Sequence, residues 1–377
     1  MKGTTTISGT VFAPNGTLPL AGVTVYVPNA NPTPIVSGTT ACDPSCTAQL
    51  SGVPLVTTRS DAHGKFVLEN VPVGSNIPLV LQIGKWRRQL TMPNVSPCVD
   101  TALPPTLTRL PAKRSEGDIP KIAVTTGGCD PIACLLPKLG LAASEFAVTS
   151  AASARITLYA GDGGSGPSGI GPASNLWSNS TELAKIDIAL FGSECAEHPE
   201  TKATPLALRD WVNAGGKLLA THHQAVWFRD LIPEWKSTAA WGSASSTAPA
   251  IVDVSFPQGK RLGDWLDGQG LTSSALALTG VDPGVGAVSS PTLGWVRPTS
   301  GNATHVVSFG APVGTKWDAQ CGRVAYAGMD VGNPADVVDA TFPTGCSATL
   351  TPQERVLAFL FFQLTACNQG STGPGGE

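Results

Sequence analysis

Over the first hundred residues, apolar and polar positions alternate in short runs that are separated by turn-forming residues. TISGTV, GVTVYV and GKFVLENV are three such runs, and we expect turns at Asn15-Gly16 and His63-Gly64. Alternation with period two is typical of strands that bury one face. Two further runs, 77–83 and 87–92, have the spacing of a closing hairpin. Because no helical period occurs here, the pattern predicts an all-β sandwich over residues 1–111.

From residue 121 the pattern changes to short continuous apolar runs, which are typical of buried strands. The runs at 122–125, 156–160, 186–191 and 217–221 are too short to be buried helices. Between the last two, residues 207–214 carry Leu208, Trp211 and Val212 at helical spacing, and the pair Gly215-Gly216 then ends the helix. A strand, a helix and a second strand in this order predict a right-handed βαβ unit of a parallel sheet.

This alternation stops near residue 231 and resumes near residue 301. The stretch between is rich in Trp, Ser, Ala and Gly, and we expect an irregular insertion that covers one edge of the sheet or the mouth of a site. Strands are expected again at 306–310 and 324–330. Thr351 and Glu354 form a capping box that predicts a closing helix. The predicted division is therefore a sandwich at 1–111, a polar linker at 112–120, an α/β domain at 121–367 with its insertion at about 231–301, and a disordered tail at 368–377.

Charge and cysteine content limit the classes of function. Only 14% of the residues are charged and the net charge is -3, without a basic cluster beyond 85–88, so we expect no nucleic-acid partner. The nine cysteines show no CxxC…CxxC spacing, which favours disulfides in a secreted protein over a metal site. We therefore expect at least two disulfides and, because nine is odd, at least one cysteine that is free or pairs between chains.

The ends of the chain are expected to reflect secretion. No export signal is visible at Met1, so we expect a mature form whose signal has been removed. No apolar run reaches the roughly 20 residues that a transmembrane segment needs. We expect secretion to the extracellular space, and a tail, GSTGPGGE, that serves as a linker.

The N-terminal pieces ISGTVFAPNG, PLAGVTVYV and SDAHGKFVLENVPVG resemble the carboxypeptidase regulatory-like (transthyretin-like) domains in type and in order. The resemblance extends to about residue 110 and implies a seven-stranded sandwich without catalytic residues, used as a spacer, adhesion module or folding support. The chain departs from this pattern by an insertion at 29–54 that contains Cys42 and Cys46. A bridge between these two cysteines, or from one of them to Cys98, would staple the insertion.

The pieces KIDIALFGSE, ALRDWVNAGGKLLATHH and GRVAYAGMD, followed by a terminal helix, resemble the class I glutamine amidotransferase-like fold, and within it the trehalose-utilisation (ThuA-like) group. The resemblance covers about 119–367 without the insertion and implies a flavodoxin-like parallel sheet. In true amidotransferases a cysteine follows the strand after the Gly-Gly pair. Thr221, His222 and His223 stand at that place here, and Cys195 follows the preceding strand, so we do not expect a glutaminase.

Polar side chains at the ends of the predicted strands form the main candidate site. In parallel sheets, ligands gather beyond the carboxyl ends of the strands. Imidazole and carboxylate groups that converge there suit general acid–base chemistry or a divalent metal such as zinc or calcium. The candidates are Glu194, His222 and Asp330 as catalytic groups, His222, His223 and Glu194 as metal ligands, with His198 and Asp130 nearby.

Each of these hypotheses has an alternative in which the residues are structural and bind no ligand. Adjacent histidines on a strand point to opposite faces, so one of His222 and His223 would be a core residue and the other a surface residue, unless a turn frees both. The GxGxxG match that begins at Gly161 is followed by prolines and glycines, which predicts a flexible loop and not a dinucleotide site. Five tryptophans could stack on sugar rings or fill a core; they are Trp227, Trp235, Trp241, Trp265 and Trp295.

The sequence thus predicts a secreted protein that binds or processes extracellular carbohydrate at the strand-end site, its partner being a polysaccharide or a cell-surface glycan. One alternative is a structural or adhesive surface protein without catalysis. A second is an ester or amide hydrolase whose nucleophile is Cys195 or a serine without the G-x-S-x-G motif, which the chain lacks.

Overall fold

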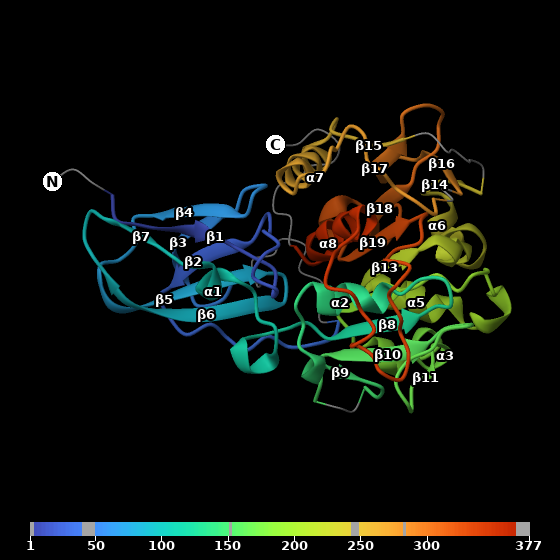
Figure 1. Ribbon diagram of the computed structural model, residues 1–377, viewed down its shortest axis with the longest axis horizontal. Helices are drawn as coiled ribbons and strands as arrows, with labels where there is room; N and C mark the ends of the chain where they lie inside the picture. The colour runs from blue at the N-terminus through green and yellow to red at the C-terminus, as the bar shows by residue number, and fades with distance from the viewer. Residues whose placement is uncertain (1–3, 40–49, 151–152, 243–248, 282–283, 367–377) are drawn as a thin grey trace.

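The computed structural model describes residues 4–39, 50–150, 153–242, 249–281 and 284–366. Strands gather in two places, a small sandwich built by the first hundred residues and a large mixed sheet with helices on its faces (Figure 1). In the described ranges, no helix is long and apolar enough to cross a membrane.

The N-terminal part forms two sheets, as the alternating pattern predicts. A three-stranded sheet has the order β4-β1-β7, and a four-stranded sheet has the order β3-β2-β5-β6. The predicted hairpin is β5 and β6, which pair antiparallel along their whole length. The elements are β1 (Thr6–Thr10), β2 (Thr24–Pro28), β3 (Pro54–Arg59), β4 (Lys65–Glu69), β5 (Gly74–Ile83), β6 (Trp86–Val95), β7 (Asp100–Ala102) and the short helix α1 (Pro105–Thr108).

Side-chain alternation explains how these strands build a core. In β4, Phe66 and Leu68 are buried whereas Val67 between them is exposed, because successive side chains of a strand point to opposite faces. The first predicted turn is held by Asn15, whose side-chain oxygen accepts hydrogen bonds from the backbone N–H groups of Thr17 and Leu18, both at 3.0 Å. Local turn chemistry and the apolar pattern therefore agree.

The second part of the chain forms a ten-stranded sheet among the described residues. Its order is β11-β10-β8-β12-β13-β19-β18-β17-β15, and β9 pairs with β10. From β11 to β19 the strands are parallel, and β10-β8-β12-β13-β19 follow the flavodoxin-like order 2-1-3-4-5. The strands are β8 (Ile122–Thr126), β9 (Phe146–Ala147), β10 (Ile156–Ala160), β11 (Gly171–Pro172), β12 (Ile188–Phe191), β13 (Lys217–Thr221), β15 (Ala250–Val252), β17 (Leu293–Pro298), β18 (Val306–Ala311) and β19 (Gly322–Ala327).

Both faces of this sheet are buried, which explains the continuous apolar runs in the sequence. One face packs against the long closing helix α8, and the opposite face packs against α5. The predicted βαβ unit is β12, α5 and β13, and β12 and β13 pair parallel as expected. The helices of this part are α2 (Leu135–Lys138), α3 (Ser174–Trp177), α4 (Ser180–Leu183), α5 (Pro205–Asn213), α6 (Pro233–Lys236), α7 (Pro257–Gly268) and α8 (Pro352–Thr365).

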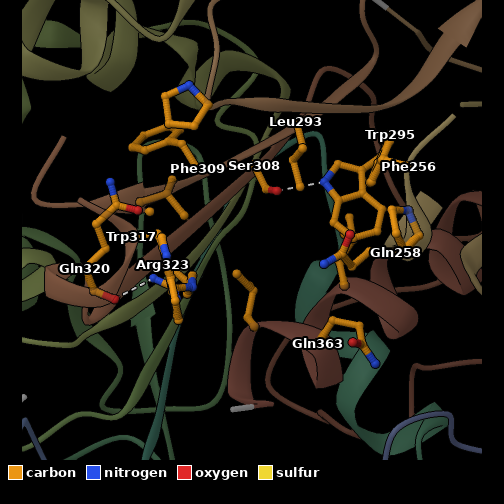
Figure 2. A pocket seen from close by; sticks show the side chains of 16 residues that line it. Phe256, Gln258, Leu293, Trp295, Ser308, Phe309, Trp317, Gln320, Arg323 and Gln363 are labelled. Carbon is orange, nitrogen blue, oxygen red and sulfur yellow. Dashed lines mark hydrogen bonds between the residues drawn. The ribbon is translucent and has the colours of Figure 1, made fainter. Parts of the chain in front are cut away.

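The predicted insertion is more regular than expected. It contains the 12-residue helix α7, the pair β14 (Ala239–Trp241) and β16 (Val285–Val288), and two strands, β15 and β17, that extend the main sheet antiparallel. Helix α7 was not predicted, because Gly259 and Gly263 weaken its helical pattern in the sequence. Both glycines are buried within the helix. Helices α7 and α8 and strands β17 to β19 border a cavity of about 150 Å³ (Figure 2).

Helix α8 links the large sheet to the sandwich. The predicted capping box is present, with Thr351 and Glu354 bonded to each other's backbone N–H groups. Trp86 of the sandwich is fully buried against Phe361 and Phe362 of α8, with ring centroids 6.2 Å and 5.8 Å away. The sandwich and one face of the large sheet consequently share one hydrophobic cluster. The domain boundaries stay a prediction from the sequence.

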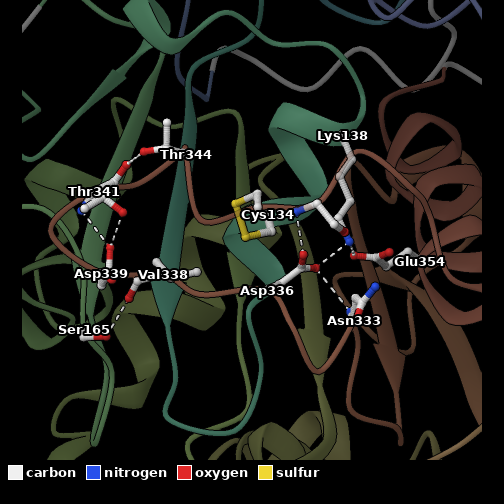
Figure 3. Close-up of a disulfide and its surroundings, with 12 residues drawn as sticks. Cys134, Lys138, Ser165, Asn333, Asp336, Val338, Asp339, Thr341, Thr344 and Glu354 are labelled. Carbon is white, nitrogen blue, oxygen red and sulfur yellow. Dashed lines mark hydrogen bonds and ion pairs between the residues drawn. A yellow bond between two sulfur atoms is a disulfide. The ribbon is translucent and has the colours of Figure 1, made fainter.

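Disulfides confirm the expectation of at least two bridges. Cys129 bonds to Cys195, and Cys134 bonds to Cys346. The Cys134–Cys346 bond ties the start of α2 to the segment before α8 (Figure 3). Cys98 is exposed and free, so the bridge that was expected from the insertion to Cys98 is wrong. Cys42 and Cys46 lie outside the described residues, and so does the tail predicted at 368–377.

Candidate functional site

The carboxyl ends of β8, β12, β13 and β19 meet at one edge of the sheet, where a ligand is expected. The strand order reverses between β8 and β12, which makes this point the topological switch of the fold. At the switch, the Cys129–Cys195 disulfide joins the loops that follow these two strands. A Cβ atom on Gly127 would lie 1.8 Å from the carbonyl oxygen of Ser193, so the backbones of the loops are also in close contact.

The disulfide settles the role of one candidate nucleophile. The sulfur of Cys195 is bonded to Cys129, so it is not a thiolate that could attack an ester or amide. The hydrolase alternative based on Cys195 is therefore wrong. A covalent bond thus links the two loops at the switch.

Glu194 is a structural residue and not part of an open site. Its carboxylate is fully buried and lies 2.5 Å from the ammonium nitrogen of Lys202, which is also fully buried. The same carboxylate accepts a hydrogen bond of 3.0 Å from the backbone N–H of Asp162. Because a buried charge needs such partners, Glu194 fixes the loop after β10 to the loop after β12. The expectation that Glu194 acts as a catalytic group is not supported.

His222 lies in a strained turn immediately after β13. Its φ of 34° is in the left-handed region, which is rare for residues other than glycine. Strand β13 ends at Thr221, and a 3-10 helix, His222–Ala225, begins. Alternation along a strand therefore does not apply to the two histidines, whose rings stack with centroids 4.0 Å apart. The turn conformation is the alternative that the structure selects.

Two of the predicted catalytic residues do meet in space. Nδ1 of His222 lies 2.8 Å from Oδ1 of Asp330, which follows β19. The hydroxyl of Tyr326 donates a hydrogen bond of 2.8 Å to the carbonyl of His222 and so supports the turn. The side chain of Asp330 is 36% exposed and that of His222 is 15% exposed, so this pair lies at the rim of the strand-end edge. Such a pair is suited to exchange a proton.

Asp130 lies beneath this pair in a closed environment. It accepts a hydrogen bond of 2.5 Å from the hydroxyl of Thr221 and is fully buried. Burial raises the pKa of Asp130 to about 8, the Thr221 bond opposes the rise, and the charge of Asp330 adds to it. The shift favours the protonated, neutral form of Asp130 over a wider pH range than for an exposed aspartate. The sequence placed Asp130 near the site but gave no signal for its protonation or for Thr221.

The remaining candidates do not complete a metal centre. In the part of the chain that the structure describes, no group of three or more His, Cys, Asp or Glu side chains is arranged to hold a metal ion. Glu194 is engaged with Lys202, so the predicted set of His222, His223 and Glu194 does not converge. His198 is partly exposed and lies 3.2 Å from Glu200, outside this cluster.

The tryptophans predicted to stack on sugars at this edge fill the core instead. Trp227 and Trp235 are 0% exposed, and their rings contact Phe191 and Phe228, respectively. Trp241 is partly buried and stacks on Phe228 at 5.0 Å. The expectation that Trp227, Trp235 and Trp241 form a sugar-binding rim is therefore wrong for the first two and unsupported for the third. The loop from Gly161 to Ile170 forms no helix, as the sequence predicts.

The cavity lies at the opposite end of β19, near the start of that strand. Arg323, the second residue of β19, pairs with Lys217, whereas Ala327 at the end of β19 pairs with Thr221 next to His222. Four residues of a strand span about 13 Å, so the cavity is well separated from the His222–Asp330 pair. Of the residues that line this cavity, only Trp295 was a candidate from the sequence, because the walls come from five separate segments.

Aromatic and amide side chains line the cavity. Trp295 is fixed by a hydrogen bond of 2.7 Å from its indole N–H to the hydroxyl of Ser308 and by an edge contact with Phe256 at 5.3 Å. Trp317 is 40% exposed, which is unusual for so large an apolar side chain. The polar lining is formed by Gln258, Ser308, Gln320, Arg323 and Gln363.

Comparison with known proteins gives little guidance. No protein-family model and no curated protein matches the chain. Two crystal structures of interface mutants of a type II cohesin–X-dockerin complex from Acetivibrio cellulolyticus are similar at 14% identity over 40% of this chain and 78% of that chain. Their TM-scores are only 0.18 and 0.17, which is too low to support an argument from fold. The likeness to carboxypeptidase regulatory-like and amidotransferase-like domains stays a prediction from the sequence.

Proposed function

We propose that the chain is an extracellular carbohydrate-binding protein, and that the cavity between α7, α8 and strands β17 to β19 is its binding site. One observation carries this proposal: the cavity combines aromatic rings with amide side chains whose hydrogen-bonding capacity is not used up. The faces of aromatic rings suit the apolar CH surfaces of sugars, and a small number of polar groups fixes the orientation of a ligand. Disulfides support an extracellular location.

The amides of the cavity have oxygens available for sugar hydroxyls. Gln320 donates from Nε2 to the carbonyls of Pro312 and Thr315, and Gln363 donates from Nε2 to the carbonyl of Ala21. Each amide oxygen has no protein donor among the described residues and is free to accept from a hydroxyl. Gln258 makes no side-chain hydrogen bond within the described part of the chain.

The cavity volume limits the ligand to one ring. A cavity of about 150 Å³ accommodates a single six-membered ring such as benzene, and because this cavity is open to solvent, the substituents of one sugar ring can project from its mouth. The remainder of the glycan would lie outside, next to the exposed face of Trp317. The protein would therefore bind a polysaccharide through a single sugar residue in the cavity, which suits an adhesive or anchoring role.

Substitution of Trp317 tests the proposal. Because Trp317 is exposed, Trp317→Ala is expected to fold normally and to weaken glycan binding about tenfold, or ~1.4 kcal/mol. Leu206→Ala, which removes an exposed apolar side chain from α5 away from the cavity, is the matched control. Retention of the variants on immobilised polysaccharides measures the effect. Equal retention of the wild type, Trp317→Ala and Leu206→Ala would contradict the proposal.

A second function, acid–base catalysis on carbohydrate, is favoured by the 2.8 Å contact between His222 and Asp330. In this alternative the carboxylate of Asp330 orients the imidazole, which exchanges a proton with the substrate, and Asp130 stays protonated beneath. The disulfide across the switch point and the burial of Trp227 and Trp235 argue against this alternative. Release of sugar or acid from polysaccharides by the wild type, with a loss of at least a hundredfold in His222→Gln but none in the control His63→Gln, would establish this alternative.

A further inference from the structure

The cavity contains a cationic group that no carboxylate neutralises. Nη1 of Arg323 donates to the backbone carbonyls of Gln320 at 2.7 Å and Gly322 at 2.9 Å, which fixes the guanidinium in place. Within the described residues, Nη2 and Nε donate to no protein group, and no Asp or Glu forms an ion pair with Arg323. Two N–H-bearing nitrogens of a rigid guanidinium are the arrangement that binds a carboxylate through two hydrogen bonds.

The glycine at position 310 and the neighbouring cation Lys217 support this assignment. A Cβ atom on Gly310 would lie 2.1 Å from Oε1 of Gln320 and 3.2 Å from Nη1 of Arg323, so a glycine at this position leaves room for both polar groups. Burial lowers the pKa of Arg323. Burial and then the charge of Arg323 lower the pKa of Lys217, the strand neighbour of Arg323, to about 7. Both cations are therefore buried, and the positive charge of Arg323 is felt by Lys217.

We propose that the cavity selects acidic sugars: the ring of a uronic acid residue packs against the exposed ring of Trp317, and its carboxylate binds Nη2 and Nε of Arg323. The amide oxygens of Gln320 and Gln363 then accept hydrogen bonds from ring hydroxyls. The partner is an anionic polysaccharide, of which one uronate residue enters the cavity. This specificity rests on the proposed function of the cavity and adds to it the charge of the ligand.

Two probes that differ only in charge distinguish carbohydrate binding in general from selectivity for acidic sugars. Oligogalacturonate carries a carboxylate on every ring, and its methyl ester keeps the ring and the hydroxyls but loses the charge. The wild type is expected to bind oligogalacturonate at least tenfold more tightly than the methyl ester in calorimetric titrations. Raising the salt concentration should weaken binding of the acid form much more than binding of the ester.

Arg323→Gln is expected to reduce the affinity for oligogalacturonate to that for the methyl ester, whereas Arg323→Lys should retain part of the difference. Arg297→Gln is the matched control, because Arg297 is also a strand arginine but lies outside the cavity lining. Equal affinity of the wild type for both probes would overturn the acidic specificity and leave carbohydrate binding intact. Absence of binding to either probe would overturn both. Binding of benzoate in place of either oligosaccharide would identify an aromatic acid site and overturn the sugar assignment.

Discussion

Replacement of Lys138 tests how the closing segment of the chain is anchored. The ammonium group of Lys138 lies 2.5 Å from Asp336 and 2.6 Å from Glu354, and the three side chains are exposed by no more than 2% (Figure 3). Glu354 is also the last member of the capping box of α8, so one lysine ties α2 to both the loop before α8 and its first turn. The variant Lys138→Met retains most of the side-chain volume and removes the charge.

The expected cost follows from what remains around the two carboxylates. Loss of one partner from a buried ion pair typically costs roughly 3–5 kcal/mol. Asp336 keeps the backbone N–H of Ser347 at 2.7 Å, and Glu354 keeps that of Thr351 at 2.8 Å, so neither carboxylate loses all its partners. We therefore expect Lys138→Met to lower the free energy of unfolding by about 3–5 kcal/mol and not by twice that amount.

Guanidinium unfolding at pH 7, followed by tryptophan fluorescence, measures this loss as a shift of the midpoint at unchanged slope. Lys260→Met is the control, because Lys260 pairs with Asp264 on the exposed face of α7 and such pairs contribute at most about 0.5 kcal/mol. A triple variant with Asp336→Asn and Glu354→Gln added to Lys138→Met should recover most of the loss. A loss below about 1 kcal/mol in Lys138→Met would refute the assignment of a buried charged triad.

Three further predictions concern the strand-end edge. Because the pKa of Asp130 is raised from 3.8 to about 8, the folded chain keeps a proton that the unfolded chain releases, and stability should fall as the pH rises from about 4 to 8; Asp130→Asn should lack this contribution in pH-dependent unfolding. Removal of the Cys129–Cys195 bridge, which spans 66 residues, by a double Cys→Ser substitution should cost roughly 4 kcal/mol in chemical unfolding, and an unchanged midpoint would show that the bridge does not form. Gly127→Ala places a methyl group on the carbonyl of Ser193 and should lower the melting temperature, and an unchanged melting temperature would contradict the close contact of the two loops.

Much of the fold is predictable from the sequence because local and global preferences agree. The apolar runs at 156–160 and 217–221 coincide with β10 and β13, and the capping box at Thr351 coincides with the start of α8. The alternating pattern likewise predicts the hairpin of β5 and β6. In these elements the local apolar pattern agrees with the burial that the fold imposes, on both faces of β10 and β13 and on one face of the hairpin strands.

The elements that were missed depend on tertiary contacts. Helix α7 carries glycines at positions where the backbone of Asp253 and the ring of Phe256 approach closely, so its helical period is weak. Strands β15 and β17 join the sheet from within a stretch without clear alternation.

The candidate site was predictable only in part for the same reason. His222 and Asp330 meet because both follow parallel strands, which the βαβ pattern implies. By contrast, Glu194 has a buried lysine partner eight residues away, Lys202, and the sequence does not distinguish this pair from an exposed one. The cavity is assembled from residues as distant as Phe256 and Gln363, and no local motif marks it.

The most direct test of carbohydrate binding in the cavity is ¹⁹F NMR of protein labelled with 5-fluorotryptophan, with resonances assigned by Trp→Phe variants. The nine tryptophans report on different regions of the molecule. Addition of oligogalacturonate is expected to shift the resonances of Trp295 and Trp317 and to leave those of the buried Trp227 and Trp235 unchanged. If the cavity resonances stay constant under saturating ligand, or if only Trp227 and Trp235 respond, the cavity is not the binding site.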